Sequence, residues 1–244
     1  MFDMKIYYLF LFILFISLRA SSQDTITFTK EKNQGKDLII FDIYHDFWQE
    51  IPSNVNVRAI NQGVNMYAML NRPIKTTNFS IALGIGLSSH NLYSDAIPVL
   101  ERNQSNQPTG NTIFTTLGNY YQKTVEYKIN KINLSYIDIP IELRFKTRAE
   151  RNKRFRASLG FKIGYNVSNH TKYKGEDVIE NTSEQVVIKK SNIRNVSNWN
   201  YGIIGRIGYG RFNLMTYYSL SKIFEKGKGP QIFPISVGLS IMPF

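Results

Sequence analysis

The feature that most constrains the fold of this chain is a two-residue alternation of large apolar side chains with small or polar ones. It is clearest in Phe79-Ser-Ile-Ala-Leu-Gly-Ile-Gly-Leu87, where every odd position is large and every even one is small. Side chains of a β-strand point alternately to its two faces, so such a segment is typical of a strand with one apolar face. Eight segments show the pattern: residues 38–48, 60–70, 79–87, 137–145, 155–167, 199–209, 212–220 and 233–241.

The direction of the apolar face decides between two kinds of barrel. In a soluble barrel it points inward, but the interior of an eight-stranded barrel is only just wide enough for its side chains. The glycines of segments such as 155–167 would then lie on an exposed surface, where they weaken strands. If the apolar face meets lipid instead, small and charged side chains fill a narrow lumen, and the segments match the ~9–11 residues of a tilted membrane strand. The sequence therefore predicts an all-β fold: an eight-stranded antiparallel up-and-down transmembrane β-barrel.

The N-terminus has the order of a secretory signal peptide. An unbroken apolar run follows Lys5, and the small residues Ala20 and Ser22 stand before Gln23. An uncleaved membrane helix is the alternative, but the run is shorter than the ~20 apolar residues that span a bilayer. We expect a cleaved signal peptide over residues 1–22, a periplasmic segment over 23–37, and a barrel over 38–244 in the outer membrane of a bacterium. Because the chain has no cysteine, no disulfide can stabilise it.

The chain is basic, with a formal net charge of +12 at pH 7. A basic protein attracts anionic partners. Nucleic acid is a poor candidate after export, and the phosphate-bearing headgroups of outer-membrane lipids are a better one. A periplasmic or extracellular protein is the other candidate partner, and a basic surface that is merely solvated is the alternative to both.

The connections between segments differ in length in a regular way. If segment 38–48 runs outward from the periplasm, then 49–57, 93–130, 168–197 and 225–231 are outer connections, and 72–77, 146–154 and 210–211 are inner turns. Long connections outside and short ones inside are typical of outer-membrane barrels. We expect the two longest, 93–130 and 168–197, to be the surface for recognition or adhesion, with plain solvated loops as the alternative.

Aromatic residues gather near the segment ends, as in the interfacial girdles of membrane barrels. The predicted outer girdle consists of Phe47, Trp48, Tyr136, Tyr165, Trp199 and Tyr201. The predicted inner girdle consists of Phe79, Phe145, Phe155, Tyr209 and Phe212. Core aromatics of a soluble fold are the alternative interpretation.

Eight charged residues fall on the predicted lumen face: Asp42, Asp46, Asp138, Glu142, Arg144, Arg156, Lys162 and Arg206. Unpaired charges in a narrow, poorly hydrated space are costly, so four acids and four bases predict a paired network that plugs the barrel. The alternative is a selectivity lining for a small pore, which the narrow bore of eight strands disfavours.

Catalytic and cofactor patterns find little support in the sequence. His90 could form a hydrolase triad with Ser88 or Ser89 and Asp95, but a triad is defined by geometry, which spacing does not provide. The chain has no cysteine and no His-x-His pattern of the kind that ligates metals. We therefore predict no enzyme, no cofactor and no metal site.

One strand carries a family resemblance. Leu134-Ser-Tyr-Ile-Asp-Ile-Pro-Ile-Glu-Leu-Arg-Phe-Lys146 resembles the Tyr-x-x-Ile-Pro-x-x-x-Arg/Lys strand of PorT-like outer-membrane β-barrel domains. The glycine-rich strands around residues 82–86 and 159–164 and the C-terminal segment from Val237 are similar too. The resemblance implies the same barrel architecture and does not by itself imply an activity.

The function predicted from the sequence is that of a structural or interaction protein with a plugged lumen and two long extracellular loops. Three alternatives stay open: an accessory component of protein secretion across the outer membrane, which the resemblance suggests, a narrow pore, and a soluble periplasmic ligand-binding barrel.

Overall fold

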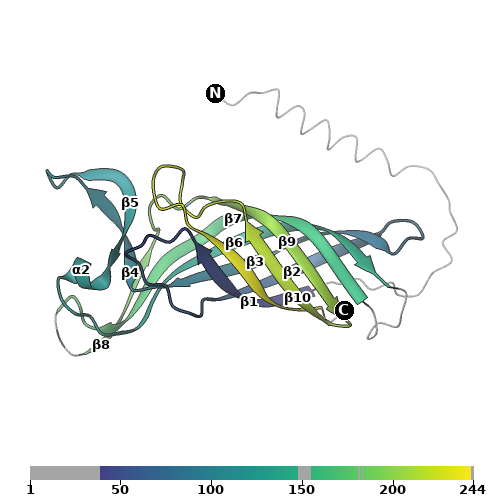
Figure 1. The fold of residues 1–244 in the computed structure, drawn as a ribbon, viewed down its shortest axis with the longest axis horizontal. Coiled ribbons are helices and arrows are strands. Elements are labelled where there is room, and N and C mark those ends of the chain that lie inside the picture. The colour runs from purple at the N-terminus through teal and green to yellow at the C-terminus, as the bar shows by residue number, and fades with distance from the viewer. Residues whose placement is uncertain (1–38, 148–154, 181, 183, 243–244) are drawn as a thin grey trace, which may run out of the picture. The chain divides into compact units, whose positions relative to one another are not determined.

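The computed structural model describes residues 39–147, 155–180, 182 and 184–242 (Figure 1). The expected signal peptide, the segment 23–37 and most of the basic turn 146–154 lie outside the described residues. The strands, in chain order, are β1 (Ile39–Gln49), β2 (Gln62–Pro73), β3 (Phe79–Tyr93), β4 (Ala96–Arg102), β5 (Pro108–Thr116), β6 (Tyr127–Lys146), β7 (Phe155–Glu176), β8 (Gln185–Ser191), β9 (Trp199–Tyr209), β10 (Phe212–Ser219) and β11 (Phe233–Ile241).

Eight of these strands form a closed antiparallel barrel. Around the wall the order is β1, β2, β3, β6, β7, β9, β10 and β11, and each strand pairs with the next. The ring closes where β11 pairs with β1, with Phe41 opposite Ile241 and Phe47 opposite Ile235. Each of the eight alternating segments overlaps one wall strand, so the predicted eight-stranded up-and-down barrel is confirmed.

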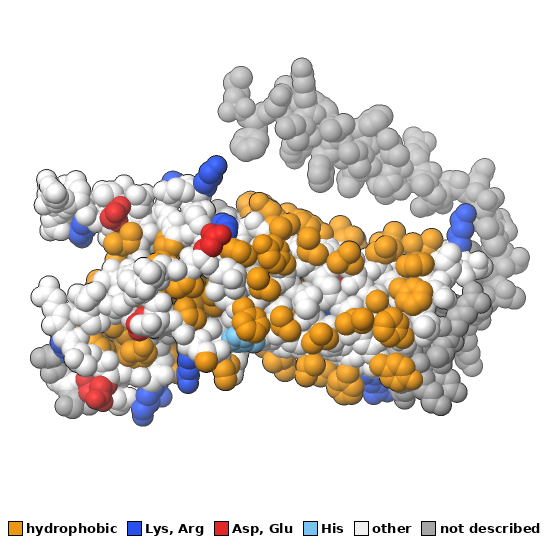
Figure 2. Space-filling model, in the orientation of Figure 1, with side chains coloured by type: hydrophobic (Ala, Val, Ile, Leu, Met, Phe, Trp, Pro, Cys, Tyr) orange, Lys and Arg blue, Asp and Glu red, His pale blue; other side chains and the backbone are white. Residues whose placement is uncertain are grey.

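The apolar faces of the wall strands point outward. Ile43, Leu159 and Phe212 are 63%, 64% and 66% exposed, whereas Asp42 and Asp138 on the opposite face are almost fully buried. Figure 2 shows hydrophobic side chains spread over the barrel wall, while the acidic side chains visible on that face gather at one end. An apolar outer wall is suited to lipid and unsuited to water, so the soluble ligand-binding barrel is excluded as an interpretation of this fold.

Glycines on the inner face give space to large side chains of neighbouring strands. Gly63 lies opposite Tyr44 on β1, and a Cβ at this glycine would fall 2.1 Å from a ring carbon of Tyr44. A Cβ at Gly202 would likewise fall 2.8 Å from a ring carbon of Tyr217. The small residues of the alternation are therefore needed because their neighbours fill the lumen.

The strand ends differ from the prediction on one side of the barrel. The turns 74–78 and 210–211 are short, and we call this side the turn end. On the other side β3, β6 and β7 continue well past the predicted limits, and the two connections expected as long loops contain β4, β5, α2 and β8. We call the described residues within 94–129 and 168–198 the cap.

Regular hydrogen bonding holds the cap together. β4 pairs with β5 as a hairpin, and β8 pairs with the far end of β7 beyond the wall (Figure 1). The short helix α2 (Leu117–Tyr121) follows β5, and the Thr116 side chain accepts a hydrogen bond from the Asn119 N–H at its start. Within the described ranges, no helix has the length and apolar character needed to cross a membrane.

The aromatic girdles are partly as predicted. At the cap end Phe47, Tyr165, Trp199 and Tyr201 are exposed on the outer wall, and at the turn end Phe79, Phe155, Tyr209 and Phe212 are exposed as well. The assignment of Trp48 and Tyr136 to the outer girdle is wrong. They alternate with the outward residues Phe47 and Ile137, so they point inward, where both are buried.

Candidate functional site

The lumen can be described in layers, beginning at the turn end. There five inward side chains pack into an apolar layer, Ile40, Tyr67, Met69, Ala82 and Met242. All of them are at most 4% exposed, although they belong to a face that is otherwise polar. Arg156 lies at this level, half-buried, with its guanidinium 3.6 Å from the sulfur of Met242.

An arginine between two carboxylates forms the next layer. The Arg206 guanidinium on β9 donates to Glu142 of β6 and to Asp42 of β1, the latter over 2.7 Å. Arg144 Nε donates to the second oxygen of Glu142 over 2.9 Å. The ring of Tyr67 lies 5.9 Å from the Arg206 guanidinium carbon. Because β1, β6 and β9 are not neighbours in the barrel wall, the two bonds of Arg206 cross the lumen.

A second ion pair lies beside this arginine cluster. Lys162 Nζ on β7 is 3.1 Å from Asp138 Oδ2 on β6, and both side chains are almost fully buried. The Tyr67 hydroxyl donates to the same Asp138 oxygen over 3.0 Å. Lys162 also lies 4.2 Å from the ring centre of Tyr217, in a cation–π arrangement.

The third polar group of the lumen contains His90, which lies beyond the eight alternating segments of the sequence. His90 Nδ1 on β3 is 3.0 Å from Asp46 Oδ2, and the Ser236 hydroxyl donates to Asp46 Oδ1 over 2.6 Å. The alternation predicts a strand that ends at Leu87, and His90 would then belong to a loop. The sequence does contain a feature that indicates the inward position of His90. Ser88, His90 and Leu92 are even-numbered like the other inward residues of β3, so they continue its inward face.

The hydrolase arrangement considered for His90 does not form. Asp95 accepts hydrogen bonds from the backbone and side-chain nitrogens of Asn56, and the carboxylate that contacts His90 is Asp46 instead. Ser89 Oγ accepts a bond from Asn133 instead of facing the histidine. The buried Ser88 hydroxyl has no hydrogen-bond partner, and the Ser236 hydroxyl donates to Asp46, so among the described residues no serine hydroxyl is hydrogen-bonded to His90.

The cap end of the lumen is occupied by apolar side chains, which we call the outer cluster. Strand ends, the cap and the β10–β11 connection all contribute to it. Its members are Trp48, Val55, Leu92, Ala96, Phe114, Ile132, Leu134, Tyr136, Val196, Ile223, Phe224 and Ile232. None is more than 9% exposed. The Trp48 indole N–H donates to the Asn91 carbonyl over 3.1 Å, so the one strongly polar atom of this tryptophan is satisfied.

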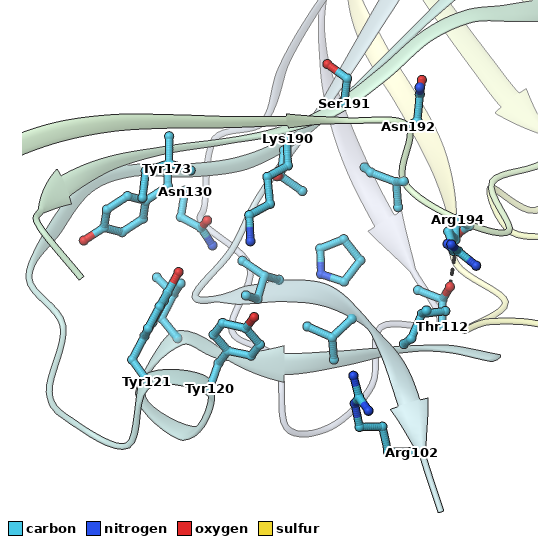
Figure 3. A pocket seen from close by; sticks show the side chains of 18 residues that line it. Arg102, Thr112, Tyr120, Tyr121, Asn130, Tyr173, Lys190, Ser191, Asn192 and Arg194 are labelled. Carbon is cyan, nitrogen blue, oxygen red and sulfur yellow. Dashed lines mark hydrogen bonds between the residues drawn. The ribbon is translucent and has the colours of Figure 1, made fainter. Parts of the chain in front are cut away.

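A separate cavity of about 610 Å³ lies within the cap (Figure 3). One side is formed by β4, β5 and α2, and the opposite side by β7, β8 and the residues after β8. Its volume lies in the range of small-molecule sites. Tyr120, Tyr121 and Tyr173 provide aromatic surface, and the aliphatic side chains of Ile97, Val99 and Ile188 complete an apolar wall.

The charges on the cavity lining are all positive. Arg102, Lys190 and Arg194 line it, and none of the described residues in the lining is acidic. In Figure 3 the Lys190 side chain extends into the cavity toward the tyrosines. Among the described residues, Lys190 and Arg194 have no ion-pair partner. Arg102 donates to the Asn106 carbonyl over 2.8 Å, and no carboxylate in the described part of the chain pairs with it.

An apolar outer wall, a charged interior and a structured cap at one end define a class of protein, the transmembrane β-barrels of bacterial outer membranes. A sequence model described as outer membrane protein beta-barrel domain matches residues 44–225, more than half of the chain. The chain belongs to this family. No curated protein and no solved structure matches it.

Proposed function

We propose that the protein is a closed, non-conducting outer-membrane barrel that holds a folded recognition cap on the outside of the cell. In this proposal the cap end is extracellular, because longer connections of such barrels lie outside and the shortest turns lie in the periplasm. The protein acts through binding rather than catalysis, with the eight charged lumen residues in a structural role.

The observation that carries this proposal is the filling of the lumen. Apolar layers lie at both ends, and between them the buried carboxylates Asp42, Asp46, Asp138 and Glu142 each have a positively charged or hydrogen-bonding partner. An open pathway for ions would require several buried pairs to separate, and each separation leaves an uncompensated buried charge. Eight strands offer no spare bore around these side chains.

Single-channel recording in a planar bilayer tests this closure. We expect the folded wild-type protein, checked by its heat-modifiable gel mobility, to show no steady conductance at neutral pH. A variant that truncates two side chains of the outer cluster, Trp48→Ala together with Phe224→Ala, is recorded in the same way for comparison. A steady open level of the wild-type protein would favour the narrow pore and contradict the proposal.

The cap cavity supports recognition as its role. Its positive lining and tyrosine surface fit a carboxylate- or sulfate-bearing saccharide, because tyrosine faces cover sugar rings and unpaired cations attract anions. We expect acidic oligosaccharides to bind more tightly than neutral ones of the same size. Lys190→Gln should weaken that binding, and Lys226→Gln, on an exposed connection away from the cavity, should leave it unchanged. Equal binding of acidic and neutral saccharides would refute this assignment.

Two narrower statements belong to the same proposal. The Tyr136 to Arg144 motif, which lies on β6, supports kinship with PorT-like barrels and hence an accessory role in secretion. Loss of secreted proteins in a deletion strain is the expected result for that role, and unchanged secretion would remove it. We also propose cleavage after Ser22, which the mass of the mature chain beginning at Gln23 would verify.

A further inference from the structure

Three lysines stand side by side on adjacent strands of the cap end. In the β6–β7 ladder Lys131 is directly opposite Lys172, and in the β7–β8 ladder Lys172 is directly opposite Lys189. On the other flank Tyr93 of β3 is opposite Lys131, and Arg58 lies 5.7 Å from the Tyr93 ring centre. Four cations thus follow one another around the barrel at one level. We call Arg58, Lys131, Lys172 and Lys189 the basic row.

The basic row faces outward, away from the cap cavity. On β7 and β8 the cavity is lined by Thr171, Tyr173, Ile188 and Lys190. Lys172 and Lys189 alternate with these residues, so their side chains leave the opposite face of the sheet. That face continues the outer wall of the barrel.

The spacing within the row is electrostatically unfavourable for the protein alone. Neighbouring strands are about 4.8 Å apart, and like charges directly opposite each other weaken strand pairing. Lys131 donates to the Asn91 side chain over 2.8 Å and to the Tyr93 hydroxyl, both uncharged groups. Among the described residues, Lys172 and Lys189 have no ion-pair partner. Glu176, the nearest acidic residue along β7, is roughly 13 Å further along the strand.

The pKa of a histidine beside the row is affected by the positive charge of the lysines. His170 lies two residues before Lys172 on the same face of β7. Its pKa is lowered from the ordinary value, first by partial burial and then by the charges of Lys189, Lys131 and Lys172. The ammonium groups of the row therefore act together on one point of the surface.

The row lies on the cap side of the part of the wall that is suited to hydrocarbon. Tyr165 of the outer girdle is opposite Ile137 on β6, and Lys131 lies six residues from Ile137 toward the cap. Six residues span about 20 Å of strand, which for a tilt of about 40° gives roughly 15 Å along the membrane normal. The row therefore lies outside the hydrocarbon layer, beyond the ~5–8 Å that phospholipid headgroups occupy on each side, where a larger headgroup is needed to reach it.

We propose that the basic row binds the phosphate groups of a glycolipid of the outer leaflet, of the lipopolysaccharide type. Lysine clusters at the edge of a membrane-spanning element attract anionic headgroups. Bound phosphates would neutralise the three opposed lysines and anchor the β6–β7–β8 sheet to the membrane surface. The proposal uses the extracellular placement of the cap end and is independent of what the cap cavity binds.

Fluorescence anisotropy with labelled lipopolysaccharide and the full chain in neutral detergent tests the proposal. Lys172→Gln with Lys189→Gln should weaken binding by roughly 10- to 30-fold, the effect of two lysines near an anionic surface. The matched control is Lys75→Gln with Lys226→Gln, which removes the same charge from exposed positions in the 74–78 turn and in the β10–β11 connection, away from the row and from the cap cavity. This control should bind like the wild-type protein.

Further arms identify the ligand and the role of the lysines. We expect enzymatically or chemically dephosphorylated lipopolysaccharide to bind weakly, and inorganic phosphate to compete poorly. Without glycolipid, the Lys172→Gln, Lys189→Gln variant should unfold at no lower denaturant concentration than the wild-type protein. Binding that survives dephosphorylation, an equal loss in the control variant, or a loss of stability in the row variant would each overturn the proposal.

Discussion

At the scale of single residues, the interior depends on a few charges whose partners come from distant parts of the sequence. Arg206 and Asp42 are separated by 164 positions, yet their side chains meet across the lumen. The alternation predicts which face each charged residue occupies. It cannot predict which charges meet, because that depends on the shear of the closed barrel and on rotamers of strands that are not neighbours. Tyr67, Tyr217 and His90 share the ionic groups for the same reason.

Replacing Arg206 by methionine should be among the most damaging changes in the lumen. Glu142 and Asp42 would be left buried without their shared cation, which costs about 3–5 kcal/mol of unfolding free energy. Arg211→Met, at an exposed position of the turn end, should cost little. Urea unfolding in lipid vesicles measures both variants. Combining Arg206→Met with Glu142→Gln and Asp42→Asn should restore part of the stability, and a mild effect of Arg206→Met alone would contradict the assigned role.

The close packing of Gly63 against the ring of Tyr44 leads to a second prediction. Gly63→Ala places a Cβ against the Tyr44 ring, so the ring must shift within a packed lumen, at a cost of about 1–3 kcal/mol. Adding Tyr44→Ser should relieve the conflict, so that the double variant loses less than the sum of the two single changes. Gly205→Ala, whose nearest neighbour is the Thr216 side chain on the outer wall, is the matched control. Additive effects of the Gly63 and Tyr44 changes would argue against this packing.

At the scale of elements, the membrane-spanning part of each strand was predictable and its extension was not. Within the wall the outward residues are large and apolar, which makes the period of two visible. Beyond it the outward positions of β3, β6 and β7 become Asn91, Asn133 and His170, so the apolar signal ends although the ladder continues. In the hairpin β4–β5 the pattern is absent from β4, which is a continuous apolar run from Ala96 to Leu100 whose residues from Ile97 to Leu100 are half-buried on both faces.

The lipid-facing assignment can be tested on a single element. Leu159 lies near the middle of the spanning part of β7 and is highly exposed. Leu159→Lys should lower the unfolding free energy in lipid vesicles by about 2–4 kcal/mol, the cost of a lysine near the bilayer midplane. Val187→Lys on β8, equally exposed but in the cap, should change it little. Similar values for the two variants would be incompatible with a membrane boundary between these positions.

At the scale of the whole molecule, eight alternating segments were enough to predict a closed ring, because an open sheet edge is not tolerated in lipid. The same count does not predict how the ring is filled. Apolar layers at both ends of the lumen arise from inward residues such as Ile40 and Met242 and from the connections that supply Phe114 and Phe224. These residues do not share one segment, and only the closed structure brings them together.

The measurement that most directly tests the account is a spin-label accessibility scan along β7 in lipid vesicles. The chain contains no cysteine, so single cysteines can be introduced and labelled at residues 157–163 without removing native ones. We predict that labels at Leu159, Phe161 and Ile163 are accepted and collide with membrane-dissolved oxygen, whereas labels at Gly160 and Lys162, which would have to enter the filled lumen, prevent formation of the heat-modifiable folded barrel. Access of the nickel reagent to the three apolar positions, or the loss of the two-residue period, would contradict an apolar wall in lipid around a filled lumen.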